Sequence, residues 1–230
     1  MKTSPVTYGL LGMLAVRSWT GYELTHQVRR SLRYTWTSSE GHLYREQKRL
    51  VELGWADVDV EASGGRSRKR YSITLEGEAA LAAWLATEPQ SPQFEIEGFM
   101  RLFYADHGTV DDMVRTLEKT AADTRQMLVE LGGFVDEYLA DGGPLWLLEH
   151  DAGGPDAERV EFHGRPMFPE RLHVVALVLD ATTQLLAQIE QFCSRTAIEV
   201  RAWPGPADRR LAASTRARLE SIRTRLDRYA

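Results

Sequence analysis

The first third of the chain contains three short helical patterns in close succession, and this order constrains the fold more than any other feature. Apolar residues recur at helical spacing within residues 6–16, 20–32 and 38–53. Thr20 and either Ser38 or Ser39 are residues that cap helix N-termini, and Gly54 can end the third helix. The pattern therefore predicts three short helices joined by tight turns.

A β-hairpin pattern follows these helices. Apolar and polar residues alternate on both sides of Gly64-Gly65, which permits a tight turn. Thr74 can cap one further helix, and Pro89 and Pro92 mark a linker behind it. We therefore expect a first domain over residues 1–88 with the order helix, helix, helix, hairpin, helix.

Long helical patterns dominate the second predicted domain, residues 89–230. Apolar residues at helical spacing run from Thr109 to Leu139, from Arg171 to Val200, and in a last stripe from Leu211 to Leu226. Residues 141–166 are rich in Gly and Pro, and we expect them to be irregular. The predicted fold is mostly α, with a small N-terminal domain and a helical C-terminal domain.

Charge is distributed unevenly between these two parts. The net charge of −5 argues by itself against a polyanionic partner. Residues 1–90, however, carry 12 Lys and Arg against 10 Asp and Glu, whereas residues 91–230 carry 16 against 23.

Cys193 is the one cysteine, which excludes an intrachain disulfide. We find no signal-peptide or membrane-spanning pattern, so we expect a cytoplasmic protein without a membrane partner.

The third helical pattern has two faces of different chemistry. At about 100° per residue, Leu43, Gln47 and Leu50 share one face, and a cluster of cations lies opposite. A short helix with an outer cationic face suits the major groove of duplex DNA, and its N-terminal donors offer a phosphate site. The alternative to DNA binding is that these cations only face solvent and have no binding role. The predicted DNA contacts of this segment are Ser38, Ser39, His42, Tyr44, Arg45, Lys48 and Arg49.

The hairpin supplies a second basic element. Its tip and returning strand carry four cations, which can contact phosphates if the hairpin lies along the duplex as a wing. A solvated run of charge is again the alternative. Two basic elements in one small domain favour DNA binding by a winged helix-turn-helix. The predicted wing contacts are Arg66, Arg68, Lys69 and Arg70.

Five short motifs in this order resemble the PadR family of transcriptional regulators. They are Tyr8-Gly9-Leu10-Leu11-Gly12, Gly21-Tyr22-Glu23-Leu24, Gly41-His42-Leu43-Tyr44, Lys48-Arg49-Leu50 and Arg68-Lys69-Arg70-Tyr71-Ser72-Ile73-Thr74-Leu75-Glu76-Gly77. The resemblance is sharp over residues 6–85 and continues loosely through residues 99–104 into a region similar to the Vir-type C-terminal part of longer PadR-like proteins. It implies a winged-helix domain, dimerisation through C-terminal helices, and repression of an adjacent operon that a small molecule relieves.

The predicted recognition helix departs from the family pattern at two positions. His42 stands where Ser or Thr is common, and Arg45 stands where Pro is common. Arg45 can pair with a guanine through two hydrogen bonds, a contact that proline cannot make. The resemblance assigns Tyr44 and Lys48-Arg49 to the recognition helix, but the two departures leave the operator sequence open.

We expect a homodimer on a pseudo-palindromic operator, because one winged domain reaches only one half-site. Residues 171–200 are expected in the dimer interface, and the last helix either joins them or folds back on its own subunit. Aromatic and histidine side chains of the second domain can line a site for a small, planar effector, although aromatic residues at helical spacing are usually core. The expected effector contacts are Phe99, Phe103, Trp146, His150 and His163.

Two other functions were weighed. Glu149-His150-Asp151 and Glu161-Phe162-His163 could serve an enzyme that modifies a small molecule, but neither has a recognised metal-ligand spacing. We therefore expect no enzymatic activity, no metal and no cofactor. A winged-helix module that binds only protein would favour an uncharged or acidic outer face on the third helix, and Arg45 opposes it.

Overall fold

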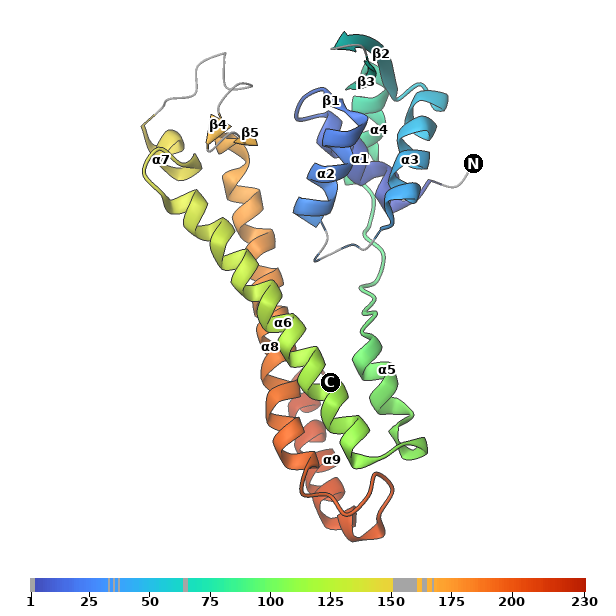
Figure 1. Ribbon diagram of the computed structural model, residues 1–230, viewed down its shortest axis with the longest axis vertical. Coiled ribbons are helices and arrows are strands. Elements are labelled where there is room, and N and C mark those ends of the chain that lie inside the picture. The colour runs from blue at the N-terminus through green and yellow to red at the C-terminus, as the bar shows by residue number, and fades with distance from the viewer. Residues whose placement is uncertain are drawn as a thin grey trace. The chain divides into compact units, whose positions relative to one another are not determined.

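The chain divides into two compact units, Met1–Pro92 and Gln93–Ala230. The computed structural model (Figure 1) describes residues 3–32, 34, 36, 38–63, 66–150, 161–162, 165–166 and 168–230. The sequence placed the domain boundary between residues 88 and 89, a few residues before the structural division. The two units are described in turn.

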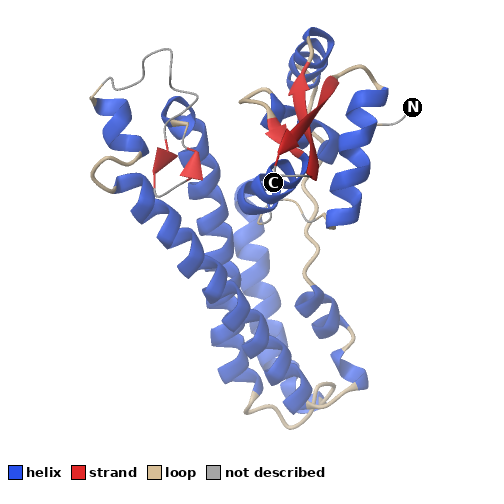
Figure 2. Ribbon diagram, turned by 45° about the horizontal axis from the view of Figure 1, so that its top comes forward, coloured by secondary structure: helices blue, strands red, loops and turns tan. Residues whose placement is uncertain are grey.

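The first unit combines a bundle of short helices with a small sheet. Helix α1 packs against α2, α3 and α4, and the strands form an antiparallel sheet of order β1-β3-β2 (Figure 2). Helices α2 and α3 form the helix-turn-helix, and the β2–β3 hairpin is the wing. The elements are α1 (Pro5–Leu14), β1 (Trp19–Thr20), α2 (Gly21–Leu32), α3 (Glu40–Glu52), β2 (Ala56–Ser63), β3 (Arg66–Ile73) and α4 (Leu75–Leu85).

Side-chain caps fix the ends of these helices. Ser39, rather than Ser38, caps α3, and its hydroxyl accepts a hydrogen bond of 3.3 Å from the His42 amide. Thr74 caps α4 in the same way. Gly54 follows α3 with a φ of +71°, a left-handed conformation that favours glycine. The predicted boundaries of α3 and α4 therefore agree closely with the structure.

Two glycines let backbones approach closely. A Cβ at Gly77 would lie 2.1 Å from the carbonyl oxygen of Trp55, so α4 can rest directly on the chain that follows α3. A Cβ at Gly21 would lie 2.9 Å from Gln47 Oε1 and 3.3 Å from the Tyr71 ring. Gly21 therefore lies at a close-packing position between α2, α3 and β3. Strand β1 was not predicted, because two residues are too few to show an alternating pattern.

The second unit is built on two long helices. Helices α6 and α8 run antiparallel along their lengths (Figure 1). The elements are α5 (Glu97–Phe103), η1 (Ala105–His107), α6 (Val110–Leu139), α7 (Pro144–Glu149), β4 (Glu161–Phe162), β5 (Arg165–Pro166), η3 (Pro169–Arg171), α8 (Leu172–Val200), η4 (Arg209–Leu211), α9 (Ala212–Leu226) and η5 (Asp227–Tyr229). The predicted long helices are all present.

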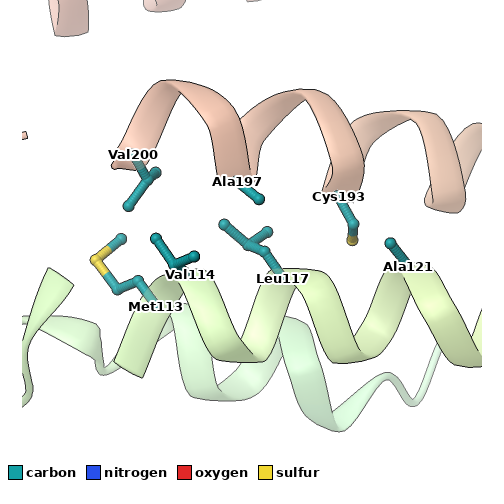
Figure 3. Close-up of a cluster of buried hydrophobic side chains, with 7 residues drawn as sticks. All are labelled: Met113, Val114, Leu117, Ala121, Cys193, Ala197 and Val200. Carbon is teal, nitrogen blue, oxygen red and sulfur yellow. The ribbon is translucent and has the colours of Figure 1, made fainter. Parts of the chain in front are cut away.

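A compact core joins the first half of α6 to the last half of α8. Leu117 and Cys193 are fully buried there, and burial raises the pKa of the Cys193 thiol (Figure 3). The seven core residues are Met113, Val114, Leu117, Ala121, Cys193, Ala197 and Val200. Ion pairs between Arg125 and Glu190 and between Arg201 and Glu118 tie the same helices together.

The prediction that residues 141–166 are irregular was wrong in part. They contain α7 and the two-stranded β4–β5 pair. Pro144 occupies the first turn of α7, where proline favours a helix, although the same residue suggested a loop in the sequence. Trp146 therefore lies within a helix, and His150 follows its last residue. Residues 151–160 and His163 lie outside the described residues.

The apolar character of α8 is largely turned outward. Within the described chain, Pro169–Val200 is the segment long and apolar enough to cross a membrane by length and composition alone, and 6 % of its most apolar window is buried. Leu177 is 72 % exposed, and Val174, Val178 and Leu185 are also exposed. A single copy of the chain thus leaves a charge-poor apolar face of α8 uncovered.

Candidate nucleic-acid interface

Helix α3 separates its core-facing and outward-facing side chains as predicted. Leu43 and Leu50 are fully buried, and Gln47 is nearly so. Arg45 and Lys48 are exposed on the other side, and Tyr44 is 39 % exposed. His42 and Arg49 are half-buried, so they contribute less exposed surface than their neighbours.

Two buried polar side chains anchor α3 to the helices beneath it. Gln47 Nε2 donates hydrogen bonds to the Gly21 carbonyl at 3.0 Å and to Thr25 Oγ1 at 2.8 Å, both on α2. The Thr7 hydroxyl of α1 donates to the Glu46 carboxylate, and both residues are buried. Glu46 was not singled out from the sequence, where a glutamate on a charged helix looks like surface. These bonds fix the rotation of α3 and therefore the direction of Arg45 and Lys48.

The exposed surface continues from α3 onto the start of α2. A Cβ at Gly21 would lie 3.8 Å from the Tyr44 ring, so Tyr44 covers the first residue of α2. Tyr22, the next residue, is 72 % exposed, and its ring stacks on His26 at 6.3 Å between centroids. The first helix of a helix-turn-helix crosses the DNA backbone, so these α2 residues belong to the candidate interface. Tyr22 and His26 were not predicted from the sequence, because the predicted contacts were confined to the third helical pattern and the hairpin.

Two features of the α3 N-terminus oppose the phosphate site that was predicted there. Ser39 already caps the helix, and Ser38 is half-buried. Glu40 puts a carboxylate in the first turn, where it opposes a bound phosphate, but Arg29 of α2 forms an ion pair with it. The ion pair partly offsets the negative charge of Glu40 at this end of the helix.

The four wing cations occupy different environments. Arg68 and Lys69 are exposed on β3, as a phosphate contact requires. Arg70 is half-buried at the base of the hairpin, where its guanidinium lies 3.9 Å from the Glu23 carboxylate and 3.5 Å from the Ser18 carbonyl. The side chain of Arg66 lies outside the described residues. The base of the wing therefore holds Arg70 against α2, and the exposed part of β3 presents Arg68 and Lys69.

The strand register sets the cross-strand neighbours of the wing cations. The register places Asp59 opposite Arg70 and Glu61 opposite Arg68. Cross-strand pairs of opposite charge stabilise a hairpin modestly. Lys69 instead lies opposite Val60. Of the exposed wing cations, Lys69 is the one whose cross-strand neighbour is apolar.

Glu23 connects the wing to the start of α2. Burial alone would raise the pKa of Glu23, but hydrogen bonds from the amide and hydroxyl of Thr20, and attraction to Arg70 and Arg17, lower it overall. The hydrogen bond from the Thr20 amide to Glu23 Oε2 measures 2.8 Å. An ionised Glu23 thus completes the Thr20 cap and holds Arg70 in place.

Of the predicted effector residues, the four that the structure describes do not converge within one chain. Phe99 of α5 packs edge-on against Phe192 of α8 at 5.7 Å, and Phe103 is largely exposed. Trp146 stacks on His150 at 4.2 Å beyond the other end of α6. Helix α5 lies beside Thr120 of α6, because a Cβ at Gly98 would lie 2.3 Å from that residue, and α7 follows the end of α6 at Leu139. At 1.5 Å per residue, this part of α6 separates the two pairs by roughly 30 Å. Among the described residues there is no group of three or more His, Cys, Asp or Glu that could hold a metal.

Known proteins resemble the chain in both sequence and fold. Residues 10–83 match the PadR-like family of transcriptional regulators. The negative transcriptional regulator PadR of Bacillus subtilis is 25 % identical over 148 residues, which cover 64 % of this chain and 81 % of that protein. The resemblance inferred from the five motifs is therefore confirmed.

Solved structures support the fold. The crystal structure of Bacillus subtilis PadR in complex with operator DNA aligns with a TM-score of 0.63 at 16 % identity, covering 86 % of this chain and 99 % of that one. The structure of the same protein in complex with p-coumaric acid aligns with a TM-score of 0.57 at 17 % identity, covering 85 % and 98 %. The predicted mostly helical fold with an N-terminal winged helix-turn-helix is confirmed.

Proposed function

We propose that the chain, whose residues 10–83 match the PadR-like family of transcriptional regulators, is a sequence-specific DNA-binding repressor that a small molecule releases from its operator. The observation that carries this proposal is the outer face of α3. It presents Arg45 and Lys48 to solvent, while buried bonds from Glu46 and Gln47 hold the helix at a fixed rotation. Major-groove recognition requires such fixed, outward-facing donors.

Each exposed part of the first unit has its own task in the proposal. Arg45 reads a base edge, because its guanidinium can bond O6 and N7 of one guanine. Lys48 and Lys69 contact phosphates and position the domain without selecting sequence. Arg70 stabilises the base of the wing through Glu23 and contributes less to binding than the exposed cations.

The protein acts as a homodimer in this proposal. One winged domain covers one half-site, so an operator with two half-sites requires two copies. The exposed apolar face of α8, which includes Val174, Leu177 and Leu185, supplies a self-complementary surface with few charges. This use of the face also explains its apolar composition without a membrane, and it suits a protein that works on DNA in the cytoplasm.

A small aromatic molecule is the proposed effector, and we assign the protein no enzymatic activity. The support is the structure of Bacillus subtilis PadR in complex with p-coumaric acid, together with the aromatic residues of the second unit. Since Phe99 and Trp146 lie far apart in one subunit, a site that uses both would need residues from two copies. His150 stacks against Trp146 and would therefore lie in the same site.

The test begins with selection of genomic DNA fragments by the purified protein. Fluorescence anisotropy then compares the wild type with an Arg45→Ala, Lys48→Ala variant on the selected operator. We expect a loss of operator affinity of roughly 100-fold or more, because each base or phosphate contact of this kind contributes about 1–3 kcal/mol. An Arg115→Ala, Lys119→Ala variant is the matched control, since it removes two exposed cations of α6.

The control variant should bind the operator like the wild type, and both variants should remain dimeric. Equal operator affinity of the Arg45→Ala, Lys48→Ala variant and the wild type would contradict the proposed role of α3. Failure of the wild type to select any fragment would contradict DNA binding altogether and would favour a protein-binding winged helix.

A further inference from the structure

Helix α9 and the short turn after it carry an apolar seam that their own chain leaves largely exposed, although Ile222 is half-buried. Successive seam residues are three and four positions apart, which is the heptad spacing of a helix that packs along a partner helix. No residue of α9 is buried, and Leu219 and Leu226 are each more than half exposed. The seam residues are Ala212, Thr215, Leu219, Ile222, Leu226 and Tyr229.

Arginine occupies the positions that flank this seam. Arg216 and Arg223 lie on one side, and Arg218 and Arg225 lie on the other. Within the chain, Arg218 forms an ion pair with Glu199 of α8, and Arg223 forms one with Asp227. Two copies of such a helix, packed parallel or antiparallel, would bring arginine against arginine along both edges, and like charges at flanking positions oppose pairing. Helix α9 is therefore unsuited to pair with itself. It suits an apolar segment with acidic flanks.

The surface beside the seam is hollowed. An open groove of about 960 Å³ runs between α9 and the segment that precedes it. Trp203, Leu211 and Leu219 supply apolar lining. The charged residues of the lining are Arg209, Arg216 and Arg223 together with Asp208 and Glu220, so cations outnumber carboxylates by one. Such a groove can take aromatic or long apolar side chains and place carboxylates within reach of guanidinium groups.

Helix α5 and its flanks have the complementary composition. Met100, Phe103 and Tyr104 are exposed, Phe103 to 79 %. Glu95, Glu97 and Asp106 lie in the same stretch, where Arg101 is the one basic residue apart from His107. Glu97 forms an ion pair with Arg101, and Asp106 lies 3.9 Å from His107, so the stretch keeps an excess of acidic groups. The opposite side of α5 already packs on its own subunit, because a Cβ at Gly98 would lie 2.3 Å from Thr120 and Phe99 contacts Phe192.

We propose that the α9 groove of one copy holds the outer face of α5 from a second copy, and that the exchange is reciprocal. The inference rests on the homodimer of the proposed function and names the segments that meet in it. Within one copy, the aromatic face of α5 is exposed and no residue of α9 is buried. Both surfaces are therefore accessible to a second chain. The charge-poor face of α8 pairs with itself, whereas α9 pairs with a different segment.

This arrangement places a dimer contact next to the DNA-binding unit in sequence. Helix α5 begins at Glu97, a few residues after the first unit ends at Pro92. A partner that holds α5 thereby restrains the C-terminal end of the link between the two units. Loss of the α9 contact should therefore weaken operator binding more than a comparable change elsewhere on the helical unit.

Mixed cross-linking tests which copies meet. A Phe103→Cys chain is mixed with a larger, tagged Leu219→Cys chain, allowed to exchange, and treated with a short bis-maleimide. We expect a covalent product of the mixed size, because both positions are exposed and meet between copies. The wild type, whose Cys193 is buried, and a Val129→Cys plus Leu219→Cys mixture are the controls and should give little product.

A chain that carries both Phe103→Cys and Leu219→Cys separates the two possible origins of the contact. Cross-linking within one copy of this chain, or no mixed product at a concentration where sedimentation shows a dimer, would overturn the proposal. No DNA is present in this experiment. A protein that binds its operator but gives no mixed product would refute the α5–α9 contact and leave the proposed function intact.

Charge reversal gives a second test that does not depend on cysteines. An Arg216→Glu, Arg223→Glu variant should raise the dimer dissociation constant tenfold or more, measured by sedimentation equilibrium. Adding Glu97→Lys and Asp106→Lys to the same chain should restore at least half of the lost affinity on a logarithmic scale. An unchanged dissociation constant in the first variant, or no recovery in the second, would contradict the pairing.

Discussion

The two units of this protein solve the problem of burying apolar surface in different ways. The first unit closes a core around Leu10, Leu24 and Leu43, which are fully buried although the unit has only 92 residues. The second unit is larger, but its main core joins α6 and α8 over half of their lengths, and Leu177 and Leu185 of α8 remain exposed. The first unit is complete as a single chain, whereas the second has the surface of a subunit.

This difference has consequences for stability. A domain that closes its own core unfolds with a free energy set by its own contacts. A subunit with open apolar faces gains stability from its partner, so its apparent stability rises with protein concentration. Substitutions in the first unit should therefore act at any concentration, and substitutions on the open faces of the second should act through the dimer.

The largest expected effect is at Gly77, where the first unit is packed most tightly. A Gly77→Ala substitution should lower the free energy of unfolding of this unit by about 3 kcal/mol, because its Cβ would overlap the Trp55 carbonyl. Hydrogen exchange of peptides from α4 measures the change in the full chain. Gly12→Ala is the control, since a Cβ there meets nothing within 4 Å and should stabilise α1 by up to about 1 kcal/mol. Equal behaviour of the two variants would refute the close contact.

The next effect concerns the open face of α8. A Leu177→Glu substitution should weaken the dimer about 100-fold, which corresponds to about 2.8 kcal/mol, because it puts a charge into an apolar interface. Sedimentation equilibrium measures the dissociation constant. Ala122→Glu, an exposed position of α6 that faces away from the α6–α8 core, is the matched control and should change little. A Leu177→Glu chain that dimerises normally would show that α8 is not part of the interface.

Helix caps should have the smallest effect and should act alike in both units. Ser39→Ala removes the cap of α3, and Thr109→Ala removes the capping box of α6. Each should cost about 1 kcal/mol, measured by hydrogen exchange near the helix start. If the Thr109 variant lost far more than the Ser39 variant, the helical unit would depend on local helix formation rather than on its partner.

The features of the fold that sequence predicted are those with local signals. Thr20, Thr74 and either Ser38 or Ser39 were predicted to cap helices, and the structure uses Thr20, Ser39 and Thr74. The apolar face of α3 was recognised from its spacing. Helix α7 was missed, because Pro144 and the glycines around it look like a loop when read without their neighbours.

The candidate site was predictable where charge follows the helix period, and not where it depends on distant contacts. Arg45 and Lys48 lie exposed, as their position on the helix predicts. The inward position of Arg70 depends on Glu23, which is remote in sequence. Likewise, no local pattern marks Glu46 as buried, because its partner is Thr7 on another helix. Phe99 and Trp146 lie far apart because the length of α6 separates them. Amino-acid composition, which grouped these aromatic residues into one site, contains no information about that distance.

We propose that the first unit binds a specific DNA sequence through the outer face of α3 and the wing. The decisive measurement is the affinity of the wild-type dimer for the selected operator and for a shuffled duplex, determined by anisotropy at several salt concentrations. We expect a preference of about 1,000-fold or more for the operator and a steep linear fall of log affinity with log salt, since several phosphate contacts release counterions. Equal affinity for both duplexes, or binding that salt does not weaken, would contradict it.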